Sequence, residues 1–292
     1  MHPKWTAKDF KQRAVILGLW LTSRAELRAW YGIADNPGLA SALKLFPQMH
    51  GAIYGPYINH AWPMERRLQT IDRHYRLLEG RATILAAAAN QPTEVIRLEE
   101  QMPGLHLVLD KTEWFLREGE VVLNLFLGDK RVLSIAFTLA REDGQLVAYV
   151  GALQGIHADN ALQMYREITH AMHHMRPRDF LVVALRQFCA AMGVARILAV
   201  SSDARQHNSP FFGDSHKQKV MLNYDEVWSD QGGTPLDNGF FEIPVAVKHR
   251  DMADIQSRKR SMYRKRYQML DKVALDIGAA CARHESAQPN SG

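Results

Sequence analysis

The sequence predicts an α+β fold in which a mixed, mainly antiparallel sheet is flanked by helices. Apolar residues recur at helical spacing in the first 80 residues, short β-favouring runs follow, and the second half alternates helices with strands. With 292 residues, 47% of them hydrophobic, the chain can bury a sizeable core. We expect a helical region over residues 1–80 packing on an α+β core over 81–280, followed by a disordered tail over 281–292.

Two amphipathic helices are expected near the start of the chain. Apolar side chains recur every three or four positions in residues 6–31 and again in residues 64–78. Gly32 and the turn signal Asn36-Pro37-Gly38 are expected to close the first segment. Residues 47–63 are rich in glycine, proline and aromatic side chains, which predicts a loop and leaves open whether it covers a pocket.

Short β-favouring runs then predict an antiparallel meander, with strands at residues 105–109, 120–127, 132–139 and 146–153. Asp143-Gly144 is a hairpin signal between the last two. The last strand ends between Gly151 and Gly155, where glycine permits either a bulge or the close approach of a ligand to the backbone.

A crossover unit is expected next. Residues 160–175 and 180–192 have helical periodicity, Gly193 suits a helix C-cap, and the apolar run 195–201 predicts a buried strand. Residues 239–247 predict one more strand, which Pro244 places at an edge or a bulge. A final helix is expected over residues 251–277.

Composition limits the classes of function. The formal net charge is +5 and the isoelectric point is near 9.2, which favours an acidic partner such as nucleic acid, an anionic membrane surface, coenzyme A or an acidic carrier protein, although solubility alone explains such a balance equally well. Cys189 and Cys281 lack the spacing of a disulfide framework or metal site. The apolar run at residues 14–21 is too short to span a bilayer, so a cytoplasmic location is expected.

Arginines precede the expected crossover helix. Arg176 and Arg178 beside a helix N-terminus would make a phosphate or carboxylate pocket, or would cap and solvate the junction together with Asp179. Gln154 on the glycine-flanked strand could orient a ligand. His207 follows the end of the crossover strand, where open α/β sheets often place their sites, although ordinary loop chemistry explains the same residue.

Other motifs are weaker or absent. His170, His173 and His174 lie at helical spacing, but no carboxylate or cysteine completes a metal site, so no metal is expected. The sequence contains no nucleophile elbow, phosphate loop or dinucleotide fingerprint. In residues 258–266, six of nine side chains are basic, which fits either an RNA- or protein-binding face or a solvated helix.

Several motifs in order resemble the VirK/YbjX family of bacterial proteins. They are Arg73-His74-Tyr75, Gly151 to Gly155, His174 to Arg178, Arg196 to Ser201, Tyr224-Asp225 with Trp228, Gly239 to Pro244, and Lys259 to Tyr267. The resemblance implies a link to virulence or the cell envelope, without a settled reaction. The expected layout also looks like that of the GNAT acyltransferases, in which the turn before the central helix holds the pyrophosphate of coenzyme A. Here Arg176 to Asp179 replace the usual glycine-rich turn, so an acyl carrier protein fits the role of donor as well as coenzyme A does.

Two hypotheses follow. In the first, the chain is an acyltransferase with no tightly bound cofactor, taking coenzyme A or another acyl thioester as co-substrate, or an acyl carrier protein as donor. Its donor-binding residues would be Gly151, Gln154, Gly155, Arg176 and Arg178, and proton transfer would fall to His207, Tyr224 or Glu242. In the second, the chain is a non-enzymatic regulator that binds RNA or a protein through the basic residues Arg258, Lys259, Arg260, Arg264 and Arg266.

Overall fold

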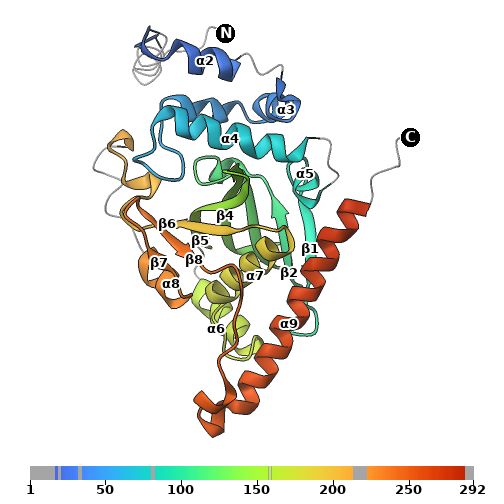
Figure 1. The fold of residues 1–292 in the computed structure, drawn as a ribbon. Coiled ribbons are helices and arrows are strands. Elements are labelled where there is room, and N and C mark those ends of the chain that lie inside the picture. Colours follow the sequence, from blue (N-terminus) through green and yellow to red (C-terminus); the bar gives the residue numbers. More distant parts are fainter. Residues whose placement is uncertain are drawn as a thin grey trace.

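The computed structural model describes residues 17–18, 21–31, 35–79, 83–156, 158, 160–212 and 222–286 (Figure 1). Within these residues one eight-stranded sheet is surrounded by helices, which confirms the predicted α+β class. The strands are β1 (Thr93–Arg97), β2 (Leu105–Asp110), β3 (Val121–Leu127), β4 (Lys130–Glu142), β5 (Gln145–Gly155), β6 (Arg196–Val200), β7 (Thr234–Pro235) and β8 (Phe240–Ile243).

The sheet order is β1-β2-β3-β4-β5-β6-β8-β7. Every neighbouring pair is antiparallel except β5 and β6, which are parallel, so the predicted meander and crossover unit are both present. The β4–β5 hairpin turns at Asp143 and Gly144, both with positive φ, as their sequence predicts. The short strand β1 was not expected, because the charged Glu94 and Arg97 interrupt its apolar residues.

Among the described residues, the α-helices that precede the sheet are α2 (Arg24–Tyr31), α3 (Pro37–Leu45), α4 (Met64–Leu78) and α5 (Ile84–Ala88). Residues 64–78 match their prediction, whereas half of the helix expected over 6–31 lies outside the described residues. The Asn36-Pro37-Gly38 turn does not merely close a segment. The Asn36 side chain accepts a hydrogen bond from the Leu39 amide, so the motif begins α3.

The later helices are α6 (Ala161–Ala171), α7 (Pro177–Ala191), α8 (Tyr224–Asp230) and α9 (Ser257–Ser286). Gly193 follows α7 with a φ of +70°, as expected of a C-terminal glycine. The last helix begins at Ser257 and ends at Ser286, rather than spanning 251–277, so residues 281–286 are helical and do not belong to a tail. Its last turns pack Ala280 and Cys281 into the core, which explains the extension.

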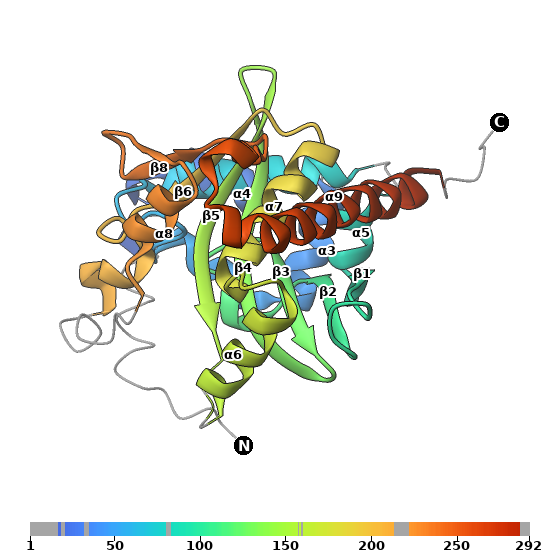
Figure 2. The ribbon, with the colours of Figure 1, turned by 90° about the horizontal axis from the view of Figure 1, so that it is seen from below.

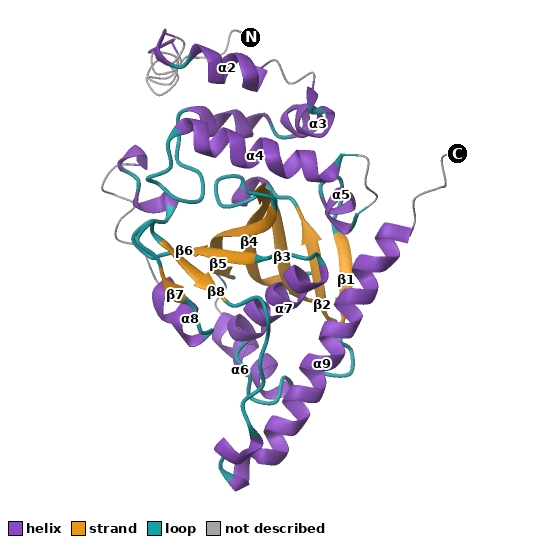
Figure 3. Cartoon of the chain, in the orientation of Figure 1, coloured by secondary structure: helices purple, strands orange, loops and turns teal. Residues whose placement is uncertain are grey.

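The helices cover the sheet unevenly. On one face α7 packs against β3 and β4, with Phe188 meeting Phe137, and α9 lies alongside α7 (Figure 2). At one end of the sheet α4 crosses the strands, and the His74 ring bonds to the backbone of Leu139 where β4 extends beyond β3 (Figure 3). The opposite face carries a small apolar cluster of its own, Phe115, Val122, Ala136 and Ala152.

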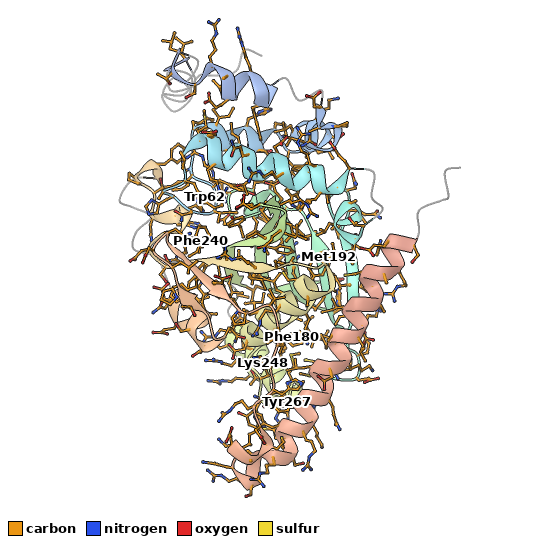
Figure 4. All side chains as sticks on the ribbon, viewed as in Figure 1. Trp62, Phe180, Met192, Phe240, Lys248 and Tyr267 are labelled. Atoms are coloured by element: carbon orange, nitrogen blue, oxygen red, sulfur yellow. The ribbon has the colours of Figure 1, made fainter. Side chains whose placement is uncertain are left out.

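The residues from α2 to α4 share the core of the sheet. Leu27, Trp30 and Leu39 belong to the same buried apolar cluster as Leu123 and Phe137. Trp62, from the connection before α4, packs on Phe240 of β8 at a ring distance of 5.6 Å (Figure 4). No helix in the described ranges combines the length and apolar character needed to cross a bilayer.

Candidate active site

Three chain segments meet at the end of the sheet where β5 and β6 separate. The Ile58 amide donates to the Arg117 carbonyl at 2.7 Å, and the Gln206 amide donates to the Ile58 carbonyl at 3.1 Å. The His60 amide donates to the Ala204 carbonyl at 2.9 Å. These backbone bonds satisfy groups that would otherwise be buried without partners, and they hold residues 57–60, 117 and 204–206 together.

Gly151 fixes one of these segments against the sheet. It is the extra residue of a bulge in β5, because Ala136 pairs with Ala152 while the next residue, Phe137, pairs with Val150. A Cβ atom at this position would overlap the Glu118 carbonyl group. The sequence signal at Gly151 is therefore confirmed as a bulge, and the backbone that approaches it belongs to the chain itself.

The close approach at the bulge holds Glu118 in place, and its carboxyl is the most informative group of the site. The residue is 3% exposed, and its Oε1 accepts a hydrogen bond of 2.8 Å from Gln206 Nε2. Burial raises the pKa of Glu118 to about 7, against the opposing effects of the Gln206 hydrogen bond and the Arg117 charge. A carboxyl with this pKa can both accept and donate a proton near neutral pH.

His207 lies beside this carboxyl. Its Nε2 is 3.7 Å from Glu118 Oε1, and its Nδ1 is 2.9 Å from Gln206 Nε2. The imidazole stacks near the Phe212 ring, with ring centroids 6.3 Å apart. The sequence-predicted proton-transfer residue His207 is thus placed next to a buried acid that the sequence did not single out.

A cleft of about 320 Å³ opens over the three side chains. It is lined by Gln48, Glu113, Trp114, Leu116, Arg117, Glu118, Gln206, His207 and Phe212. Gln48 comes from the segment 47–63, so that segment forms part of the wall. Trp114 is 77% exposed, and Arg117 lies under the Phe211 ring at 5.3 Å. The cleft combines aromatic surface, a guanidinium group and a neutral-range acid, which is the combination expected of a small-molecule site.

A second hollow, of about 150 Å³, lies between α9 and the β1–β2 connection. Its charged groups are surface side chains such as Lys272, which is paired with Glu100. We place the candidate site at Glu118 because the perturbed acid lies there.

Tyr224 occupies the gap between the diverging strands. Its hydroxyl accepts from the Leu153 amide at 2.8 Å and donates to the Leu153 carbonyl at 3.1 Å, replacing the partners that β6 no longer supplies. The side chain is 3% exposed and carries the Arg205 guanidinium over its ring. Tyr224 therefore lies close to the cleft, with its hydroxyl committed to the backbone of β5.

Glu242 lies elsewhere. Both of its carboxylate oxygens accept from Arg196, at 2.7 and 2.9 Å, at the beginning of β6. His207 follows the other end of that strand, so the structure does not bring Glu242 to the cleft. Two donor-binding candidates also lie apart from it: Gln154 is exposed opposite Ser134, and Gly155 faces the Tyr165 hydroxyl.

Arg176 and Arg178 stand before and within the first turn of α7, as predicted, and are surrounded by carboxylates. Arg176 pairs with Asp179 at 2.6 Å and with Asp230 at 3.0 Å. Arg178 lies 3.5 Å from Asp179 and 3.7 Å from Asp230. Two positive charges thus face two negative charges, and a phosphate bound here would compete with both aspartates.

The remaining candidates lie far from the cleft in the fold. Arg258, Lys259, Arg260, Arg264 and Arg266 are on the first turns of α9. His170 and His174 meet edge to face at 5.6 Å. Over the described ranges, no three His, Cys, Asp or Glu side chains are grouped closely enough to hold a metal ion.

Sequence reasoning missed Glu118 and Gln206. One signal was available, because Arg117-Glu118-Gly119-Glu120 places two carboxylates immediately before a strand that is apolar except for Asn124. Such carboxylates are drawn towards the core by the strand that follows, and buried acids have perturbed pKa values.

Glu120 forms a second, closed network beneath α4. It pairs with Lys111 at 2.6 Å, with both side chains essentially inaccessible, and accepts from the hydroxyls of Tyr57 at 3.0 Å and Tyr75 at 2.8 Å. Burial alone would raise its pKa, but Lys111 and these hydrogen bonds hold the pKa of Glu120 below its usual value. Because both carboxylate oxygens are bonded to buried partners, we assign this network to stability.

Together, the fold and the site define an α+β protein with a buried acid–histidine pair in a cleft. The chain belongs to the family described as "Protein of unknown function (DUF535)", whose model matches residues 5–279. An uncharacterized protein of Haemophilus influenzae is 31% identical over 215 residues, which are 72% of this chain and 70% of that protein. The uncharacterized protein YbjX of Escherichia coli K12 is 25% identical over 275 residues, 92% of this chain and 82% of its own, which confirms the predicted VirK/YbjX membership.

Proposed function

We propose that the chain is an acyltransferase in which Glu118 acts as the general base. The observation that carries the proposal is the Glu118 carboxyl itself, buried at a cleft of about 320 Å³ with a pKa of about 7. General bases work best when their pKa lies near the working pH, and ordinary glutamates fall well below that range.

The strand layout supports the acyl class. An antiparallel meander, a parallel β5–β6 pair joined through α6 and α7, and antiparallel strands after β6 are the features that we expect of a GNAT-like acyltransferase, and they support the proposal by analogy. In open α/β sheets, ligands bind where strands diverge at their carboxyl ends, and the Glu118 cleft adjoins that position.

The proposed reaction needs one proton acceptor. The Glu118 carboxylate takes the proton of an amine or hydroxyl acceptor, whose nitrogen or oxygen attacks the thioester carbonyl carbon. The carbon–sulfur bond breaks, and the thiolate that leaves takes up the proton that Glu118 accepted. His207, whose Nε2 is 3.7 Å from Glu118 Oε1, relays this proton from the carboxyl to the sulfur and leaves Glu118 ionised for the next turnover. Gln206 orients the carboxylate through its amide hydrogen bond. Of the proton-transfer candidates named from the sequence, His207 is kept, and Glu118 takes the place of Tyr224 and Glu242.

The donor is a coenzyme A thioester or an acyl carrier protein, and Arg176 and Arg178 are its proposed phosphate-binding residues. Arg178→Ala should raise the Kd of an acyl-coenzyme A at least several-fold in calorimetric titration. An unchanged Kd would assign the donor phosphates to another surface, with Arg117 in the cleft wall as the next candidate. The envelope and virulence link stays a prediction.

Thiol release tests the proposal directly. The purified chain is incubated with a panel of acyl-coenzyme A thioesters and amine or hydroxyl acceptors, and free thiol is measured. Glu118→Gln keeps the size and hydrogen bonding of the side chain but removes the base, so we expect kcat to fall about 10²- to 10⁴-fold.

The matched control is Glu226→Gln, an exposed glutamate of α8, which should leave turnover unchanged. Equal activity of Glu118→Gln and wild type, on any donor that turns over, would refute the assignment of the base. Absence of turnover with every donor class would refute the acyl proposal.

A further inference from the structure

The first turns of the last helix form a lobe that contributes no residue to the cleft. We define the basic lobe as residues 248–268, the connection before α9 together with the first turns of that helix. It projects beyond the body of the molecule, with Lys248 and Tyr267 lying near each other at its base (Figure 4; Figure 1). None of its residues belongs to the main apolar core cluster around the sheet.

The basic lobe is held in place by contacts between its own residues and by a contact with His173, in the connection between α6 and α7. The His249 ring stacks on Tyr267 with centroids 4.1 Å apart, and the Arg250 amide donates to the Tyr267 hydroxyl at 3.1 Å. Arg260 donates to the Ile255 carbonyl at 2.9 Å, and Arg266 donates to the His173 carbonyl at 2.7 Å. Arg260 and Arg266 therefore stabilise the lobe, and the remaining lysine and arginine side chains of the lobe are available to bind a partner.

The charge of the whole protein is concentrated here. The basic lobe contains eight lysines and arginines and two aspartates, a net charge of +6, whereas the complete chain has +5, so all other residues together sum to −1. Within the described part of the chain, none of the eight bases belongs to an ion pair, although Arg66, Arg131 and Arg196 elsewhere do. A cluster of uncompensated cations attracts a polyanion.

One face of the helix has the chemistry of a phosphate-binding surface. Positions three and four apart share a face, and this spacing joins a set of exposed side chains: Arg258, Ser261, Arg264, Lys265 and Gln268. All five can donate hydrogen bonds, and none is acidic or apolar. Membrane-surface helices require an apolar face, and protein interfaces generally have an apolar centre, so both fit less well.

We propose that this face binds the phosphodiester backbone of a nucleic acid. Arginine, lysine, serine and glutamine are the usual phosphate contacts, and they carry little sequence information, so the binding should be weakly sequence-dependent. The proposal is independent of acyl transfer, because none of the five side chains lies at the cleft.

Fluorescence anisotropy with labelled 20-nucleotide RNA, single-stranded DNA and duplex DNA, from about 50 to 200 mM salt, tests the proposal. Wild-type affinity should fall steeply with salt. The triple variant Arg258→Gln, Arg264→Gln, Lys265→Gln removes three phosphate contacts, so the slope of log K against log salt should become shallower by about 2 to 3. The nucleic acid bound most tightly identifies the natural class.

The matched control is Lys44→Gln, Lys130→Gln, Arg166→Gln, which removes the same charge from exposed positions of other elements. It should retain wild-type binding within about twofold, and both variants should keep the wild-type melting temperature. The proposal is overturned if no nucleic acid binds, if the two triple variants weaken binding equally, or if anionic vesicles bind while all three nucleic acids do not.

Discussion

At the scale of single residues, the contacts of Lys111 explain how a charged group is tolerated in the core. Its ammonium lies 2.6 Å from Glu120 Oε2 and near the faces of the Phe46 and Tyr75 rings. Lys111→Met should therefore lower the free energy of unfolding by about 3–5 kcal/mol, because it leaves an uncompensated buried carboxylate.

The double variant Lys111→Met, Glu120→Met removes both charges. Its free energy of unfolding should fall by less than that of Lys111→Met, although Tyr57 and Tyr75 lose an acceptor. Urea denaturation at neutral pH measures both. A double variant that is less stable than Lys111→Met would contradict the assignment of a coupled pair.

The candidate site could be predicted only in part at this scale. His207 was placed by its position after a strand, which is a local signal. Glu118 reaches it through Gln206, which lies 88 positions further along the chain, and that proximity depends on three loops whose paths no periodicity encodes. Glu242 was given as an alternative to His207, and the sequence does not show that the two lie at opposite ends of β6.

At the scale of elements, the bulge in β5 is the feature on which the site depends. Gly151→Ala should lower the free energy of unfolding by about 1–3 kcal/mol or more, since the new Cβ overlaps the Glu118 backbone. Turnover should fall as well, because Glu118 is displaced.

Gly278→Ala in α9 provides the control. No atom lies within 4 Å of the new Cβ, so this substitution should instead stabilise the protein by about 0.5–1 kcal/mol. Denaturant unfolding of the two variants measures both effects. A Gly151→Ala protein as stable and as active as wild type would contradict the role of the bulge.

Elements with strong periodicity were predicted well, and those fixed by tertiary packing were not. Helix α4 and strands β2 to β5 follow patterns that extend over several residues. Helix α3 was taken for a turn because Asn-Pro-Gly serves equally as a helix start. The end of α9 was placed too early, since Ala280 and Cys281 become helical by packing into the core.

At the scale of the whole molecule, the buried acid of the site should be visible in the stability of the fold. Burial raises the pKa of Glu118 to about 7, so the folded state keeps this proton between pH 4.5 and 7 while the unfolded state loses it. The stabilisation from Glu118 is present below pH 4.5 and is lost as the pH rises to 7.

His74 has the opposite effect, because burial lowers its pKa to about 4. Its stabilising contribution is complete above pH 6.5 and is lost as the pH falls towards 4. The pH profile of wild type alone would therefore mix the two groups, whereas the difference between wild type and a Glu118 variant isolates the acid.

The most direct test is the free energy of unfolding of wild type and Glu118→Gln, measured in urea at pH 5 and pH 8. Glutamine does not ionise, so from pH 5 to pH 8 the free energy of unfolding of Glu118→Gln should rise by about 3 kcal/mol relative to that of wild type. Parallel profiles, with the same difference at both pH values, would mean that Glu118 titrates as an ordinary carboxyl and would contradict its role as the neutral-range base of the cleft.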